Sequence, residues 1–328
     1  MIPLSVLDLV SVREGHDVSE AMAATAQLAR AAEEAGYKRF WIAEHHATEG
    51  VAGGAAAVVL AHVGHATSTI RIGSGGIMLP NHNPFVIAEQ FGTLDALFPG
   101  RVDLGLGRAP GAGGRIAQAL RKDLMHAAQS FPQDVVELRA LLTGDIDLPI
   151  TATPGLGAKV ELWMLGSSLF GAQLAARLGL PYAFASHFAP DHLDEALAIY
   201  RRDFQPSAAL DKPHAMVAMT AICAETDAEA VFLASSQDQA FVRLRTGDPG
   251  RLPPPVENYH ESLPPGARAM LDHMSVARAV GSPATVREKI LRFIERTDAD
   301  ELILSGSTYD PQARCQSLRL IAEALGET

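Results

Sequence analysis

The stretch WIAEHHATEG, Trp41 to Gly50, places Glu44, His45 and His46 side by side after a short apolar run. Imidazole and carboxylate groups can transfer protons, bind a metal ion or hydrogen-bond a loop backbone. If the apolar run is a strand that continues through Glu44, neighbouring side chains point to opposite faces, so His45 and His46 do not converge on one ion. We therefore predict no metal site here, and a catalytic and a structural histidine both remain open.

A second stretch, GRVDLGLGRAPGAGG, ends an apolar run in a glycine-rich turn that carries Arg108. Gly105 and Gly107 match the start of a dinucleotide fingerprint, but Pro110 stands where the third glycine is needed, so we reject that match. What remains is an arginine among small residues at the end of a strand, where its guanidinium can bind a phosphate. The alternative is a surface salt bridge.

A third stretch, WMLGSSLFGAQLAARLGLP, runs from an apolar segment through Gly166, Ser167 and Ser168 into a helical pattern. Amide and hydroxyl groups at a helix N-terminus bind anions, although ordinary N-capping by serine is the alternative. Together with Arg108 on the neighbouring strand, this turn predicts a phosphorylated ligand that lies across the strand ends.

A fourth stretch, IGSGGIMLPNHNPF, carries Gly75 and Gly76 inside an otherwise apolar strand. Glycine weakens a strand interior, so it indicates a bulge or a group that approaches the backbone closely, such as a flat ring. His82 and Asn83 in the following loop are further candidates for the same site.

These residues need a scaffold that gathers the ends of separate strands, and strand and helix patterns alternate along the whole chain. We predict strands at 2–9, 39–44, 70–79, 101–107, 160–166, 182–186, 215–224 and 301–306. We predict helices at 19–35, 52–66, 84–97, 132–143, 168–178, 190–204, 227–243, 283–296 and 311–325. Eight such units predict a closed (β/α)8 TIM barrel, whose active site lies at the C-terminal ends of the strands. A doubly wound open sheet is the alternative.

The chain has more residues than such a barrel needs. A barrel of this type takes about 250 residues, whereas the chain has 328, and the surplus falls at 108–131 and at 243–269. The second run lies between strands 7 and 8 and is rich in proline and glycine, which argues against a regular helix. We expect it to form a lid over the barrel mouth; the alternatives are that it contacts a second subunit or is simply mobile. Since no linker divides the chain, we expect one domain, 1–328.

Composition excludes several classes of partner. Asp and Glu total 38 against 27 Lys and Arg, a net charge of -11, which gives no reason to expect nucleic acid or an anionic membrane surface. No apolar run reaches the roughly 20 residues of a membrane-spanning helix. The two cysteines, Cys223 and Cys315, and the N-terminal sequence favour a reducing, cytoplasmic location.

Taken together, the motifs resemble those of the bacterial luciferase-like flavin monooxygenase family, along essentially the whole chain. The resemblance is carried by AEHH after the second strand, LPNHNPFVIAEQFGTLDALFPGR after the third, PGRVDLGLGRAPG at the fourth, LGSS followed by LGLP at the fifth, and ASHFAP after the sixth. The motifs LPNHNPFVIAEQFGTLDALFPGR and ASHFAP resemble those of a single-chain bacterial branch of the family, often described as alkanal monooxygenases.

The resemblance implies residue roles. His45 matches the catalytic histidine of luciferase, and Glu44 or His46 could orient it. The peptide between Gly75 and Gly76 matches a non-prolyl cis bond against the isoalloxazine ring. Matches to the segments that hold the FMN phosphate are Arg108, Gly166, Ser167 and Ser168.

The resemblance also implies an activity. A separate flavin reductase would supply reduced FMN, and oxygen would then be used to oxidise a small apolar substrate such as an aldehyde. We expect a homodimer. Two alternatives remain open: a relative that transfers hydride with a deazaflavin and without oxygen, and a flavin-binding protein without turnover. Emission of light does not follow from the resemblance.

Overall fold

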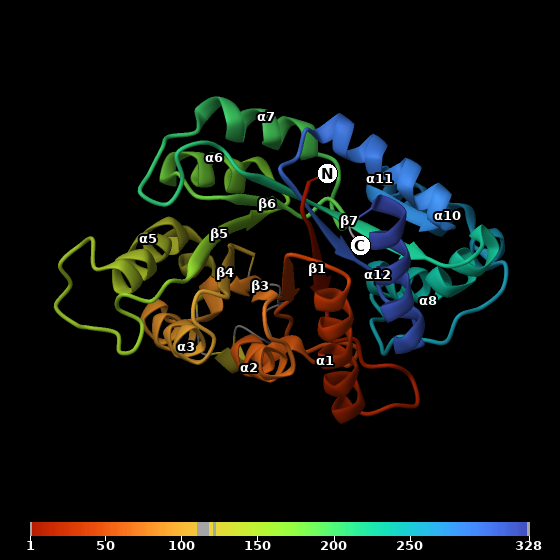
Figure 1. Ribbon diagram of the computed structural model, residues 1–328, viewed down its shortest axis with the longest axis horizontal. Coiled ribbons are helices and arrows are strands. Elements are labelled where there is room, and N and C mark those ends of the chain that lie inside the picture. Colours follow the sequence, from red (N-terminus) through yellow and green to blue (C-terminus); the bar gives the residue numbers. More distant parts are fainter. Residues whose placement is uncertain (1, 110–117, 121–122, 327–328) are drawn as a thin grey trace.

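Parallel strands close into a barrel with helices packed around it in this computed structural model, which describes residues 2–109, 118–120 and 123–326 (Figure 1). The strands are β1 (Leu4–Asp8), β2 (Arg39–Ile42), β3 (Arg71–Met78), β4 (Val102–Gly107), β5 (Glu161–Gly166), β6 (Tyr182–Phe184), β7 (Ala215–Cys223), β8 (Arg278–Gly281) and β9 (Glu301–Ser305). The helices are α1 (Val18–Glu34), α2 (Ala56–Ala66), α3 (Pro84–Leu97), α5 (Leu124–Thr143), α6 (Leu169–Leu178), α7 (Leu193–Asp203), α8 (Asp227–Thr246), α9 (Tyr259–Ser262), α10 (Pro265–Met274), α11 (Pro283–Thr297) and α12 (Pro311–Leu325).

Strands β1 to β7 and β9 form the closed barrel, which confirms the (β/α)8 prediction over the open sheet. Each strand from β1 to β6 pairs in parallel with the next one, β7 pairs with β6 and β9, and β9 pairs with β1. The short strand β8 was not predicted. It pairs with Thr220 to Cys223 of β7, whereas β9 pairs with the earlier part of the same strand, Met216 to Thr220.

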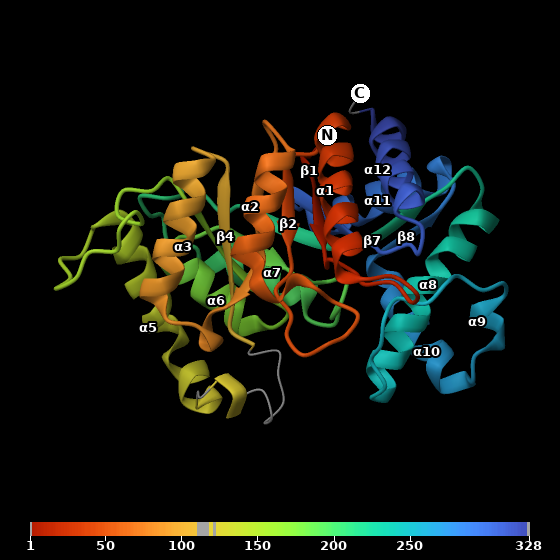
Figure 2. The same cartoon turned by 90° about the horizontal axis from the view of Figure 1, so that it is seen from below.

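The insertion between the seventh and eighth barrel strands contains more helix than the sequence suggested. Helix α8 continues to Thr246, and α9 and α10 follow within and beyond the run 243–269. The run is thus not one regular helix, as expected, but it contains α9 and the start of α10, which were not predicted. Pro265 occupies the first turn of α10, where the missing N–H has no helical partner to lose. Figure 2 shows α9 and α10 toward the side of the barrel opposite to the two chain termini.

Extended chain joins α8 to α9 and runs along the segment that follows β1. The Leu252 amide donates to the carbonyl of Val12, and the Leu252 carbonyl accepts from the amide of Glu14, both at 2.9 Å. The stretch is thus held to the barrel near the ends of the strands. Within the other surplus, 108–131, residues 110–117 and 121–122 lie outside the described part of the chain.

The barrel interior is filled by side chains rather than open. Trp41 and Trp163 are buried there with their rings 5.3 Å apart in an edge-to-face arrangement, next to Leu7, Met216 and Ile303. Both cysteines are buried and free. No helix in the described ranges is long and apolar enough to cross a membrane.

A network of ion pairs closes the barrel at the N-terminal ends of its strands. Arg39 bonds Asp103 and Glu301, each at 2.9 Å, and Glu161 at 3.2 Å. Arg71 also bonds Asp103. Asp103 and Glu301 are fully buried, so their charges depend on these partners. We call this group the floor network.

Candidate active site

The C-terminal ends of the strands border a cavity of about 750 Å³, within the size range of sites for cofactor-sized ligands. We call it the main cavity. All six residues predicted to bind the cofactor line it: Gly75, Gly76, Arg108, Gly166, Ser167 and Ser168. Apolar side chains make up much of the remaining wall, among them Leu7, Leu9, Met78, Leu165 and Phe170.

The Gly75–Gly76 peptide is cis, as the resemblance implies. A β-carbon on Gly75 would lie 2.7 Å from Cδ1 of Leu7, and one on Gly76 would lie 2.6 Å from the carbonyl oxygen of Gly105. The pairing of β3 with β4 also shifts register between Ser74 and Ile77. The bulge that the sequence left open is therefore present, and the strand has room only for glycine. A bare backbone surface faces the main cavity at this point.

Arg108 is exposed, and its guanidinium carbon lies 4.0 Å from the centroid of the Phe170 ring. Such a cation–π contact holds the guanidinium plane and leaves its N–H groups directed outward. No carboxylate among the described residues forms an ion pair with it, so the salt bridge considered from the sequence is not seen there.

Ser168 is the N-cap residue of α6, but its side chain makes no capping hydrogen bond. Ordinary serine capping therefore does not explain this turn. The Ser168 hydroxyl and the free amides of the first helical turn are left for another acceptor, and Arg108 lines the same cavity. The combination suits a phosphate group.

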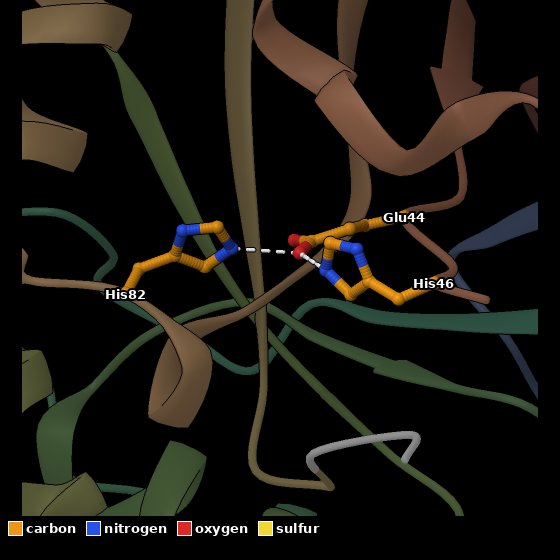
Figure 3. A group of neighbouring side chains, drawn as sticks. All are labelled: Glu44, His46 and His82. Atoms are coloured by element: carbon orange, nitrogen blue, oxygen red, sulfur yellow. Dashed lines mark hydrogen bonds and ion pairs between the residues drawn. The ribbon is translucent and has the colours of Figure 1, made fainter. Parts of the chain in front are cut away.

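Glu44 connects two histidines at the rim of the main cavity (Figure 3). Its Oε1 accepts hydrogen bonds from Nε2 of His46 at 2.5 Å and from Nε2 of His82 at 2.6 Å, and its Oε2 accepts from the Met78 amide at 2.9 Å. Burial alone would raise the pKa of Glu44, but these hydrogen bonds and the charge of His82 lower it below the ordinary value. Glu44 is thus ionised and holds both rings in place.

Glu44, His46 and His82 are also a group that could hold a metal ion, since their ligand atoms lie within 4.8 Å of one another. His45 and His46, the pair considered from the sequence, indeed diverge. The convergence of Glu44 and His46 on His82 was not predicted, because β2 ends at Ile42 and these residues lie on a loop. The hydrogen bonds within the group explain its geometry without an ion, and the absence of a metal site stays a prediction.

His45 turns away from that group. Its Nδ1 lies 3.1 Å from Oγ1 of Thr48, and neither Glu44 nor the His46 ring hydrogen-bonds it. The partner of its ring is therefore Thr48, a residue that the sequence did not single out. Burial lowers the pKa of His45 below its ordinary value, which keeps the ring neutral near pH 7 and able to accept a proton.

A second cavity of about 190 Å³, here called the side pocket, adjoins the main cavity and shares Leu9, His187 and Phe188 with it. Thr48 lines the side pocket and Glu44 lines the main cavity, whereas His45 itself lines neither. His187 belongs to the ASHFAP motif, to which the sequence gave no chemical role. Its position just after β6 is the signal that could have identified it.

Comparison with known proteins identifies the family of this chain. The model of the family described as luciferase-like monooxygenase matches residues 2–301. A luciferase-like monooxygenase of Escherichia coli strain K12 is 46% identical over 327 residues, which cover 99% of this chain and 98% of that protein.

Solved structures are similar over the same length. The structure of apo-MsnO8 has a TM-score of 0.89 at 35% sequence identity, covering 100% of this chain and 99% of that one. The oxygenating constituent of 3,6-diketocamphane monooxygenase from Pseudomonas putida, solved in complex with FMN, has a TM-score of 0.74 at 18% identity, with coverage of 100% and 99%. This last likeness is one of fold. The family match and the identity across nearly the whole chain establish that the protein belongs to the luciferase-like monooxygenase family and is a flavin-dependent monooxygenase.

Proposed function

We propose that this protein is the oxygenase of a two-component system, which takes reduced FMN from a separate flavin reductase and uses O2 to oxidise a small apolar substrate such as an aldehyde. The observation that carries the proposal is the main cavity, which is lined both by a bare glycine backbone and by a group of side chains suited to an anion. The FMN complex of a protein with the same fold is consistent with that ligand.

Arg108, the Ser167 and Ser168 hydroxyls and the first amides of α6 would hold the phosphate. Gly75 and Gly76 would lie against the isoalloxazine ring, where any side chain would clash with the neighbouring strand or with Leu7. These residues would hold reduced flavin, which when bound would supply the two electrons that activate oxygen.

His45 would handle protons in the reaction. Its Nδ1 is engaged by Thr48, so Nε2 is the atom that exchanges a proton with the reacting groups. Because the ring is neutral near pH 7, it accepts a proton first and can then return it. Glu44 would hold the loop that carries His45, because it accepts hydrogen bonds from the His46 ring and from the Met78 amide at the end of β3.

The segment 243–269 would act as a lid of a single barrel domain that spans 1–328. Support comes from Pro249, Gly250 and Leu252, which form part of the side pocket wall next to the main cavity. A cover of this kind keeps water from a reaction that would otherwise release hydrogen peroxide. We also propose a homodimer in the cytoplasm, a location with which two buried free thiols are consistent.

The test is to mix the protein with reduced FMN, admit oxygen and follow both flavin reoxidation and hydrogen peroxide. Bound reduced FMN should reoxidise more slowly than free reduced FMN, and an added aldehyde should be oxidised with one oxygen atom from labelled O2. Tight binding of a deazaflavin with oxygen-independent turnover would contradict the proposal. FMN binding with no oxidation of any substrate, and peroxide released as fast as from free flavin, would indicate a flavin-binding protein instead.

A further inference from the structure

The side pocket has the chemistry of a site for an uncharged molecule. Its described lining contains no Asp, Glu, Lys or Arg. Val51, Ala240, Phe241, Leu244 and Leu252 make up an apolar wall. An ionised group buried there would lack a counter-charge and would lose its hydration, which is costly. At about 190 Å³ the pocket is also smaller than most sites for drug-sized ligands, so it suits a short chain.

Most polar side chains of the pocket are already occupied by the protein. The hydroxyls of Ser11 and Ser307 lie 3.1 Å apart, and the side-chain oxygen of Gln237 accepts from the Ser307 amide at 2.7 Å. Thr48 bonds His45. These contacts connect segments that form the pocket.

His187 is different, and it lies where the side pocket meets the main cavity. Its Nδ1 is buried with no hydrogen-bond partner among the described residues. Burial lowers the pKa of His187 to about 4, so the ring is neutral near pH 7 and carries one proton. A buried N–H without a partner is rarer than an unfilled acceptor, which favours the proton on Nε2. In that tautomer the ring presents one N–H donor to the two cavities that it lines.

We propose that the side pocket binds the substrate as an uncharged molecule with a short apolar chain and an acceptor oxygen, and that the Nε2–H of His187 donates to this oxygen. The chain would lie against Phe241 and Leu252, and the oxygen-bearing carbon would lie at the edge of the main cavity. His187 is thus a specificity-determining residue. Its N–H can donate a hydrogen bond to a neutral acceptor oxygen, whereas the neutral ring supplies no positive charge to an anion. The inference rests on the proposed function and narrows its substrate class.

The side pocket lies between the insertion and the loop after β2. A β-carbon on Gly50 would lie 2.2 Å from the carbonyl oxygen of Gly250, so the loop after β2 and the insertion touch directly. Arg245 lies 5.1 Å from the ring centroids of both Phe188 and Phe241, which fixes two of the aromatic walls. The pocket therefore joins the insertion to the site rather than standing apart from it.

Binding of matched probes tests the proposal without turnover. Heptan-2-one has a chain and a neutral acceptor, and heptanoate has the same chain with a charge. Isothermal titration into the protein, with and without saturating oxidised FMN, should show that heptan-2-one binds at least about tenfold more tightly than heptanoate. Equal or tighter binding of heptanoate would overturn the assignment of an uncharged substrate.

Variants locate the binding. His187→Ala should weaken heptan-2-one binding by roughly threefold to tenfold, the scale of one hydrogen bond, and His187→Gln, which keeps an N–H donor, should recover part of the loss. Ala240→Phe should fill the pocket and abolish ketone binding. Val231→Phe is the matched control, since Val231 is an exposed residue of the same helix that lines neither cavity.

The outcomes separate this inference from the proposed function. Ketone binding that is insensitive to both Ala240→Phe and His187→Ala would overturn the side pocket as the substrate site, even if FMN binds. Failure of the wild-type protein to bind FMN would contradict the proposed function, whereas ketone binding that Ala240→Phe abolishes would still support the pocket.

Discussion

The two ends of the barrel use their polar groups in opposite ways. In the floor network, Arg39 reaches three carboxylates, and Glu301 is also bonded by Ser5 at 2.5 Å and by Lys38 at 3.2 Å. At the mouth, by contrast, Arg108 has no described carboxylate partner and the Ser168 hydroxyl makes no capping bond. Groups that satisfy one another stabilise the fold, whereas groups left unsatisfied in a cavity are available to a ligand.

Glu44 shows that the mouth also contains a satisfied network. It is as fully bonded as the floor carboxylates, but its partners His46 and His82 come from two loops rather than from strands. Its role by this comparison is to position the loop that carries His45. The mouth therefore differs from the floor at Arg108 and Ser168, whose polar groups lack a described carboxylate or capping partner, and not at Glu44.

The largest effect should come from the floor. Glu301→Gln removes a buried negative charge beside Arg39 while keeping the side-chain shape, and should lower the free energy of unfolding at pH 7 by about 3 kcal/mol. Chemical denaturation measures this change. FMN affinity of the folded variant should match that of the wild type, and a large loss of FMN affinity would break the contrast between the two ends.

Glu301 should also make the free energy of unfolding depend on pH. Burial alone would raise the pKa of Glu301, but the hydrogen bond from His214 and the charges of Arg39 and Lys38 lower it to about 2. Since the folded pKa lies below the ordinary value of 4.5, this stabilisation is complete above pH 4.5 and is lost as the pH falls toward 2. The difference in stability between wild type and Glu301→Gln should shrink over that interval.

At the mouth, the largest effect should be on chemistry. His45→Ala should still bind FMN but should lose substrate oxidation by roughly 100-fold or more, as expected for a lost general acid–base group. Hydrogen peroxide release should then dominate, which a coupled peroxide assay measures. Thr48→Val, which removes only the hydroxyl that holds the ring, should cause a smaller loss. Wild-type product formation by His45→Ala would make His45 a structural neighbour.

A smaller effect should appear in cofactor binding. Arg108→Ala should weaken FMN binding by about 1.5–3 kcal/mol, because a charge-assisted hydrogen bond is left unmade. Folding should hardly change, since Arg108 is exposed and contacts Phe170. Arg296→Ala is the control: that guanidinium also stacks on an aromatic ring, Phe293, and neither residue lines either cavity. Equal FMN affinity of wild type and Arg108→Ala would place the phosphate elsewhere.

The barrel could be predicted from the sequence because the pattern of a strand followed by a helix repeats along the chain. Each of the eight barrel strands overlaps its predicted range, and α3 and α12 have the predicted bounds. Strand β8 was not predicted because its four residues are too few to show a hydrophobic pattern. It pairs with β7 mainly where that long strand extends beyond its pairing with β9. Helix α10 was not predicted because proline usually breaks a helix. Pro265 instead begins this one, at the position where its missing N–H costs no hydrogen bond.

The site was predictable where one motif follows one strand. Gly75 lies in the C-terminal half of β3, and Arg108 and Ser168 follow β4 and β5, so the barrel topology brings them to one cavity. Pairings between distant loops left no such signal, which is why the bond between Glu44 and His82 and the junction at His187 were missed. The floor network did leave a trace, since charged residues such as Arg39 and Asp103 interrupt apolar strands.

The insertion shares one feature with each end of the barrel. It is held by hydrogen bonds within the protein, as the floor network is, but it lies on the mouth side. Two backbone bonds join Leu252 to the segment after β1, the Gln239 amide donates to the Pro254 carbonyl at 2.9 Å, and the Val256 amide donates to Ser235 at 2.8 Å.

If 243–269 is a lid, FMN should favour its closed form and protect it. Trypsin cleavage after Arg251, an exposed residue, should then slow by about twofold to fivefold at saturating FMN, a modest effect because local opening near a bound ligand is only partly suppressed. Cleavage after Arg202, which is 70% exposed on α7, is the internal control and should not change. Protection that follows protein concentration and ignores FMN would show instead that this segment contacts a second subunit, and the lid would then have to be abandoned.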